Sequence, residues 1–269
     1  MIHLFALLSL LLCGVCYTGF QNSSHFHNTG NRRSLLLLVF GGALLLRLLL
    51  AYTTHGFSND IACFAAWADR IFTLGPGQFY SAEMFTDYPP GFMYVLYLIG
   101  ALRSLLQIPY YSDLHILLLK LPAILCDIAC GFLLYREAVK RLHFSDLQGI
   151  FAASAYLFQP AVILNSSCWG QVDSVYTLMI ILMCLFLMKG NLLPAYAVYG
   201  LGVLLKPQML IFTPVLLAGI WDHVFLQDFS WRKFFYNLCG GLVVICGMLL
   251  LCAPFGLTAA ISQYTSTLG

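Results

Sequence analysis

Charged residues are scarce in this sequence. Thirteen lysines and arginines and eleven aspartates and glutamates make up only 9% of the 269 residues, whereas a soluble domain carries about 25%. Hydrophobic residues reach 61%, and the mean hydropathy is +0.85. The composition therefore excludes a soluble catalytic domain and predicts a polytopic membrane protein with about six to eight apolar segments. The net charge of +2 gives no indication of nucleic-acid binding.

The ten cysteines show no metal-ligand spacing with histidines. Most of them lie in apolar runs, and Cys13 and Cys16 form a CxxC pattern inside a hydrophobic segment. We interpret them as small apolar core residues and not as a disulfide framework. We expect no metal site and no cofactor.

The apolar runs predict an all-α fold, a transmembrane helical bundle with a large first extracytoplasmic loop that contains interfacial helices. Residues 1–33 are an apolar segment and linker, with 1–20 either an extra span or a signal-like N-terminus. The transmembrane domain is expected over 34–269. Its predicted apolar segments are 34–53, 114–135, 148–164, 175–188, 192–205, 209–221 and 234–252. The segments 192–205 and 209–221 are each about half the length of a span, and a Lys206-Pro207 break lies between them.

Basic residues orient these spans. Arg32 and Arg33 indicate that the first span begins on the cytoplasmic side, so that the loop 56–90 lies outside. The apolar segment 91–106 is ambiguous, at the short end for a span. If it crossed, the basic cluster at 136–141 would move outside, so we expect a non-crossing or re-entrant helix.

The loop 56–90 is the longest polar interval and holds four of the eleven acidic residues. Within it, 60–72 has apolar residues at helical spacing, which predicts an amphipathic helix in the interface plane with Trp67 at headgroup level. Three charges lie inside predicted spans: Arg47, Lys120 and Asp127. Arg47 either extends its charge toward an interface or faces the bundle interior. Because charges in lipid are costly, Lys120 and Asp127 should face protein or a cavity, and structural pairing with neighbouring helices is the favoured interpretation for these two.

Four polar clusters share the outer face in this topology. The candidate site residues are Asp60, Asp87, Tyr88, Trp169, Gln171, Asp173, Lys206 and Gln208. A carboxylate such as Asp60 is suited to deprotonate an acceptor hydroxyl, and Lys206 to hold a leaving phosphate. The aromatic and amide side chains are suited to bind a sugar. Each residue alone is more often a cap, a solvated charge or an interface anchor.

The motif order resembles a known family. It runs from Asp60 after the first span through Asp87-Tyr-Pro-Pro90, Lys120-(x)6-Asp127, Trp169-Gly-Gln-Val-Asp-Ser174 and Lys206-Pro-Gln208. This resembles the GT-C superfamily of membrane glycosyltransferases, especially bacterial members similar to polyprenyl- or dolichyl-phosphate-mannose mannosyltransferases. The motif order is also similar to that of eukaryotic glucosyltransferases that use dolichyl-phosphate glucose.

The resemblance implies inverting transfer of a mannose or glucose from a polyprenyl-phosphate donor to a glycan, cell-envelope or lipid-linked acceptor. Asp60 would be the general base, on the outer face of a bacterial plasma membrane, with Asp87, Tyr88, Trp169, Gln171, Asp173, Lys206 and Gln208 binding substrate. Many members carry paired acidic residues where this chain has Asn59-Asp60, so a divalent metal is possible but not supported. The family is longer, which implies that this sequence is an N-terminal portion.

Two other functions remain open. A transporter or flippase for a lipid-linked sugar or polar solute would use Arg47, Lys120, Asp127 and Lys206 as an intramembrane charge path. Transporters commonly contain paired broken helices, and only one broken pair is visible here, at Lys206-Pro207. A non-catalytic assembly subunit is the third possibility.

Overall fold

The structure is a computed structural model, which describes residues 9–12, 14–15, 17–19, 32–80, 85–227, 229–259 and 262. All regular elements within these ranges are helical, which confirms the all-α fold class. Four of the described helices are long and apolar enough to cross a membrane: Arg32–Thr53, Asp113–Lys140, Pro207–Leu226 and Trp231–Phe255. A bent pair, Asp146–Leu157 with Pro160–Trp169, is a fifth candidate. The chain is an integral, multi-pass membrane protein.

The chain divides into two compact units, each built from two stretches of sequence. Unit 1 is Met1–Ile61 with Tyr111–Ser174, and unit 2 is Ala62–Tyr110 with Val175–Gly269. Two of the boundaries fall inside helices, in α3 (Ser58–Leu74) and near the start of α8 (Asp173–Met188). The single transmembrane domain expected over 34–269 stays a prediction, and the expectations for residues 1–20 fall mostly outside the described residues.

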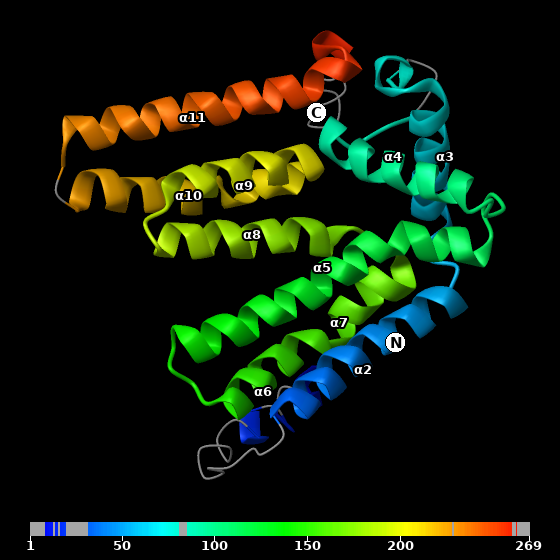
Figure 1. Cartoon of the computed structure of the whole chain (residues 1–269), viewed down its shortest axis with the longest axis horizontal. Helices are drawn as coiled ribbons and strands as arrows, with labels where there is room; N and C mark the ends of the chain where they lie inside the picture. The colour runs from blue at the N-terminus through cyan, green and yellow to red at the C-terminus, as the bar shows by residue number, and fades with distance from the viewer. Residues whose placement is uncertain are drawn as a thin grey trace. The chain divides into compact units, whose positions relative to one another are not determined.

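Among the described residues of unit 1, the helices α2 (Arg32–Thr53), α5 (Asp113–Lys140) and α6 (Asp146–Leu157) lie side by side (Figure 1). Their close approach depends on small residues. A Cβ at Gly131 of α5 would come within 2.6 Å of the Leu157 side chain of α6. The buried core of this packing consists of Ala43, Tyr135, Ile150, Ala153 and Leu157.

The helical segment that begins with α6 is interrupted after Leu157, and this break lies next to the buried polar groups described below. Helix α6 begins with a capping box formed by Ser145 and Gln148. It ends before α7 (Pro160–Ile163) and the π-helical turn η2 (Leu164–Trp169), which are bent by 52° from it. Pro160 has no N–H to continue the helical hydrogen bonds. The last carbonyls of α6 therefore need donors from elsewhere in the protein.

Unit 2 contains α4 (Pro90–Leu105), α9 (Leu192–Leu205), α10 (Thr213–Trp221) and α11 (Trp231–Cys252) (Figure 1). Shorter turns are η1 (Pro76–Gln78), η3 (Pro207–Phe212), η4 (Asp222–Leu226) and η5 (Ala253–Phe255). Its buried core consists of Met183, Leu192, Ala195, Tyr196, Val203, Met209, Leu216 and Val224. Close packing again depends on glycine, because a Cβ at Gly91 would lie 2.5 Å from the Leu204 carbonyl oxygen.

The structure corrects two details of the sequence-based expectations. Trp67 is not the exposed interface anchor that we expected: it is 2% exposed, and its Nε1–H donates to the Phe85 carbonyl at 3.0 Å. The run expected over 209–221 is not half-length, because η3 and η4 extend α10 to the span-length segment Pro207–Leu226. The expected break at Lys206 is present, with an extended backbone at that residue. That α4 does not cross the membrane stays a prediction.

Candidate functional site

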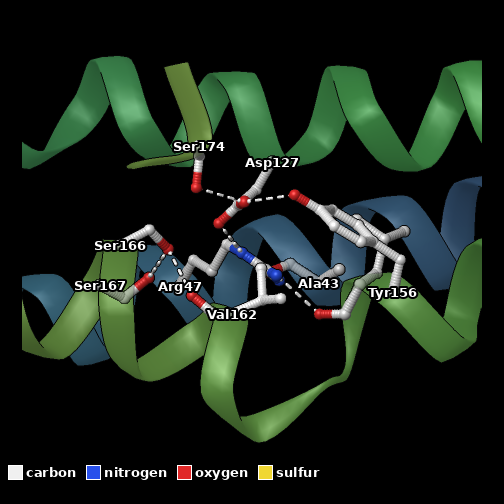
Figure 2. A network of polar contacts seen from close by, with 9 residues as sticks. Ala43, Arg47, Asp127, Tyr156, Val162, Ser166, Ser167 and Ser174 are labelled. Atoms are coloured by element: carbon white, nitrogen blue, oxygen red, sulfur yellow. Dashed lines mark hydrogen bonds and ion pairs between the residues drawn. The ribbon is translucent and has the colours of Figure 1, made fainter. Parts of the chain in front are cut away.

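A fully buried ion pair lies at the centre of unit 1 (Figure 2). The Nε of Arg47 on α2 is 3.3 Å from the Oδ2 of Asp127 on α5, and both side chains are 0% exposed. Such a pair is tolerated only when further hydrogen bonds satisfy its remaining donors and acceptors. The expectation that Asp127 pairs with a neighbouring helix is confirmed, and of the two alternatives for Arg47 the structure shows the interior position.

The surrounding groups satisfy both charges. Asp127 Oδ1 accepts hydrogen bonds from the Tyr156 hydroxyl at 3.1 Å and the Ser174 hydroxyl at 2.6 Å. Arg47 Nη2 donates to the Leu157 carbonyl at 2.7 Å, which lies at the break after α6. Figure 2 shows these groups converging from α2, α5, α6 and the start of α8. The network therefore joins four elements at one point.

Lys120 serves as a cap for the end of α2. Its Nζ, on the buried face of α5, donates to the carbonyls of Ala51 at 3.2 Å and Thr54 at 2.6 Å. It also contacts the Thr54 hydroxyl at 3.1 Å. The last carbonyls of a helix lack partners in the helix itself, and a cation favours the negative end of the helix dipole. Lys120 supplies both the donors and the charge.

Asp60 lies in the first turn of α3 and holds a neighbouring loop. Its Oδ2 accepts a hydrogen bond from Trp169 Nε1 at 2.9 Å and another from Gln171 Nε2. The backbone N–H of Phe57 donates to the Trp169 carbonyl at 2.8 Å, and the two rings lie 5.2 Å apart. The Asp60 carboxylate therefore links the start of α3 to the loop that follows η2.

The loop between η2 and α8 is also closed by its own bonds. Asp173 Oδ2 accepts from Asn165 Nδ2 at 2.9 Å, and the Asn165 carbonyl accepts from the N–H groups of Gly170 and Gln171. Gly170 has a φ of +90°, and a Cβ there would lie 2.6 Å from Ile61 and 3.4 Å from the Lys120 side chain. The glycine is required by both the turn and the close packing.

Lys206 is a buried cation of unit 2. Its Nζ lies 5.7 Å from the Tyr88 ring centroid and 5.6 Å from that of Tyr176, and the residue is 8% exposed. Aromatic faces attract an ammonium most strongly where little water reaches it. The Tyr88 carbonyl accepts a hydrogen bond from the Tyr80 hydroxyl at 3.1 Å, and burial raises the pKa of Tyr80. The aromatic contacts hold the ammonium of Lys206 in place.

The eight predicted site residues divide between the two units. Asp60, Trp169, Gln171 and Asp173 belong to unit 1, whereas Asp87, Tyr88, Lys206 and Gln208 belong to unit 2. The structure joins Asp60 to Trp169 and Gln171 directly, and it places Lys206 on Tyr88. The side chains of Asp87 and Gln208 are exposed. A single functional site formed by all eight stays a prediction.

Sequence reasoning did not find the partners of the buried charges. It singled out Arg47, Lys120 and Asp127, but not Tyr156 or the backbone carbonyls at the ends of α2 and α6 that accept hydrogen bonds from Arg47 and Lys120. Tyr156 lies in an apolar run with no local signal. Within the described ranges, no group of three His, Cys, Asp or Glu side chains is arranged to hold a metal ion.

These features define a multi-pass membrane protein whose buried polar side chains bond mainly to one another and to helix ends. The family model described as GPI transamidase subunit PIG-U matches residues 32–269. The chain belongs to this family. A search of curated proteins gave no match.

Family membership overturns the functional expectations. The chain is not a GT-C hexosyltransferase of the mannosyltransferase type, so a polyprenyl-phosphate sugar donor and a glycan acceptor are not its partners. The transporter alternative and the bacterial plasma membrane are likewise unsupported. The physical reason is visible in the contacts: Asp60, Lys120 and Asp127 satisfy helix ends, amides and an arginine. Several residues of the motif order that resembled a catalytic set therefore make contacts that hold the fold together.

Proposed function

We propose that this chain is a membrane-embedded subunit of a GPI transamidase that gives the complex a rigid frame and an apolar association surface. Family membership over residues 32–269 is the observation that carries the proposal. In this role the chain does not supply the groups that break or form the amide bond. The proposal places the chain in the endoplasmic reticulum membrane.

The buried polar contacts support the role of a frame. The Arg47–Asp127 pair and the Lys120 cap fix α2, α5 and the break after α6 relative to one another. A buried pair of this kind is strongly destabilising when one partner is removed. Arg47, Asp127 and Lys120 already bond to groups of the protein, so they are poorly placed to bind and release a substrate. They are well placed to keep the helices in register.

The outer face of α2 supports the role in association. Leu37, Leu38 and Leu49 are 75%, 70% and 56% exposed, and the apolar window of this helix is only 17% buried within the chain. In a membrane, such a face contacts lipid or the helices of another subunit. The proposal assigns part of this face to other subunits of the complex.

The test is a complementation experiment in cells of the source organism that lack their own copy of the gene. The wild-type chain should restore GPI-anchored proteins at the cell surface and should co-purify with the other transamidase subunits. Leu37→Arg/Leu38→Arg on α2 should reduce co-purification. A matched pair, Leu142→Arg/His143→Arg in the exposed turn after α5, should not. Restored surface proteins without any co-purification would contradict the proposal.

A further inference from the structure

Two adjoining cavities lie in unit 2 at the end of α10 and the start of α11. One is polar, with a volume of about 520 Å³, and is lined by His223, Ser230, Arg232, Lys233, Tyr236 and Asn237. The other is an apolar groove of about 360 Å³ lined mainly by α10 and α11, with Leu216, Ile220, Phe234, Leu238, Leu242 and Ile245. Asn237 lines both, so the polar cavity opens beside the end of the groove.

We propose that these cavities form a binding site for an anionic glycerophospholipid of the cytoplasmic leaflet. The phosphate and headgroup occupy the polar cavity, and one acyl chain lies in the groove. Neither cavity shares a residue with the polar contacts around Asp60, Lys120 or Lys206. The proposal does not depend on the transamidase role.

Charge complementarity supports an anionic ligand. Arg232, Lys233 and, from η4, His223 all line the polar cavity. A guanidinium matches phosphate oxygens in a two-pronged geometry. The Lys233 ammonium donates to the Gln227 carbonyl at 3.2 Å. Basic residues at this end also place it on the cytoplasmic side, where anionic lipids are enriched.

Aromatic side chains place the polar cavity at headgroup depth. Trp221, Trp231 and Tyr236 are 58%, 66% and 65% exposed and lie at the same end of α10 and α11. Exposed tryptophans and tyrosines concentrate at the boundary between headgroups and hydrocarbon. The groove continues along α11 from this boundary toward Ile245, in the direction that an acyl chain takes from its headgroup.

Two glycines line the cavities. Gly190 has a φ of +70°, and a Cβ there would come within 3.0 Å of the His223 ring. Gly241 lines the groove, and a Cβ added there would meet no atom within 4 Å. At the junction, Asn237 accepts from the Tyr196 hydroxyl at 3.3 Å and donates to the Lys233 carbonyl at 2.8 Å. Hydrogen bonds therefore fix the position of Asn237, the residue that both cavities share.

A transmembrane helix of another subunit is the competing occupant of the groove. Such a helix would fill the apolar space but would make no use of the basic lining of the polar cavity. A lipid satisfies both cavities with one molecule. The arrangement of a basic cavity beside an apolar groove therefore favours the lipid.

The test is lipid retention by the full chain purified in mild detergent, measured by native mass spectrometry. The probes are dioleoylphosphatidylserine and dioleoylphosphatidylcholine, which differ only in the headgroup. The chain should retain the serine lipid preferentially, and Arg232→Gln/Lys233→Gln should weaken its binding about tenfold. Lys140→Gln/Arg141→Gln removes the same charge at the exposed end of α5 and should leave binding unchanged.

A second pair of variants tests the groove. Gly241→Leu fills the open space and should reduce retention of both lipids, whereas Gly247→Leu, at an equally open position on the same helix, should not. Equal retention of the two lipids by the wild-type chain would overturn the proposal. So would a Gly241→Leu chain that keeps its lipid but no longer co-purifies with other subunits, because that result assigns the groove to a partner helix.

Discussion

Arg47 and Asp127 are 80 residues apart in sequence, yet Nε and Oδ2 lie 3.3 Å apart with both side chains fully buried. The carboxylate also accepts from Tyr156 and Ser174, and the guanidinium reaches the carbonyl of Leu157 at the break after α6. This contact joins the first described span to the middle of the chain. It is the clearest example of polar groups used to hold this membrane protein together.

Removal of one partner of this pair should destabilise the protein strongly. Asp127→Ala leaves Arg47 buried without its counter-charge, and the expected loss of stability is about 3–5 kcal/mol. Asp127→Asn should cost less, because the amide oxygen still accepts from Tyr156 or Ser174. The measurement is the thermal unfolding midpoint of the purified chain in detergent.

The double variant Arg47→Met/Asp127→Leu is the control for this prediction. It removes both charges and keeps the volume, so it should recover most of the stability lost in Asp127→Ala. A double variant as unstable as the single one would show that the ion pair itself, and not the burial of an unpaired charge, is responsible.

Lys120→Met should loosen the end of α2. The carbonyls of Ala51 and Thr54 lose their donor, and each buried acceptor left without one costs about 1–3 kcal/mol. Amide hydrogen exchange should accelerate around residues 51–57, while the interior of α5 stays protected. Lys140→Met, at the exposed end of α5, is the matched control. Unchanged exchange at the end of α2 would contradict the capping role.

Gly170→Ala should displace the loop that carries Trp169. The φ of +90° costs an L-residue about 1–2 kcal/mol, and the added Cβ would lie 2.6 Å from Ile61. Gly247→Ala, where nothing lies within 4 Å, should be neutral or slightly stabilising. Comparison of the two unfolding midpoints checks the prediction, and equal midpoints would refute it.

Asp60→Asn distinguishes a structural carboxylate from a catalytic one. The asparagine keeps an oxygen that accepts from Trp169 or Gln171, so the loop should stay in place. We expect GPI-anchored protein at the cell surface to remain within about twofold of wild type, since one hydrogen bond contributes about 1 kcal/mol. Loss of surface protein from a normally folded, fully assembled variant would restore a chemical role for Asp60.

Much of the fold follows from hydropathy, because lipid requires long helical runs of apolar residues. The spans at α2, α5 and α11, the helix α3 and the break at Lys206 were all predictable from the sequence. The burial of Trp67 was not, because its partner Phe85 and the rings around it belong to other segments. An amphipathic pattern alone does not show whether the apolar face of a helix lies against the lipid or in the protein interior.

The function was not predictable from the motifs. Asp60, Lys120 and Asp127 stand at positions that resemble a sugar-transferase set, and the same residue types also serve as caps and buried pairs. Only the contacts separate the two uses: Lys120 reaches the end of α2, and Asp127 reaches Arg47. Such pairings join residues that are distant in sequence, so the spacing of residues near either partner does not predict them.

The most direct test of the central claim is the composition of what this chain assembles with. The tagged wild-type chain is expressed in source cells that lack their own copy, and its partners are identified after mild solubilisation. We expect the other GPI transamidase subunits to co-purify and GPI-anchored proteins to return to the cell surface. A chain that assembles with none of them and transfers hexose from a polyprenyl-phosphate donor would contradict the account.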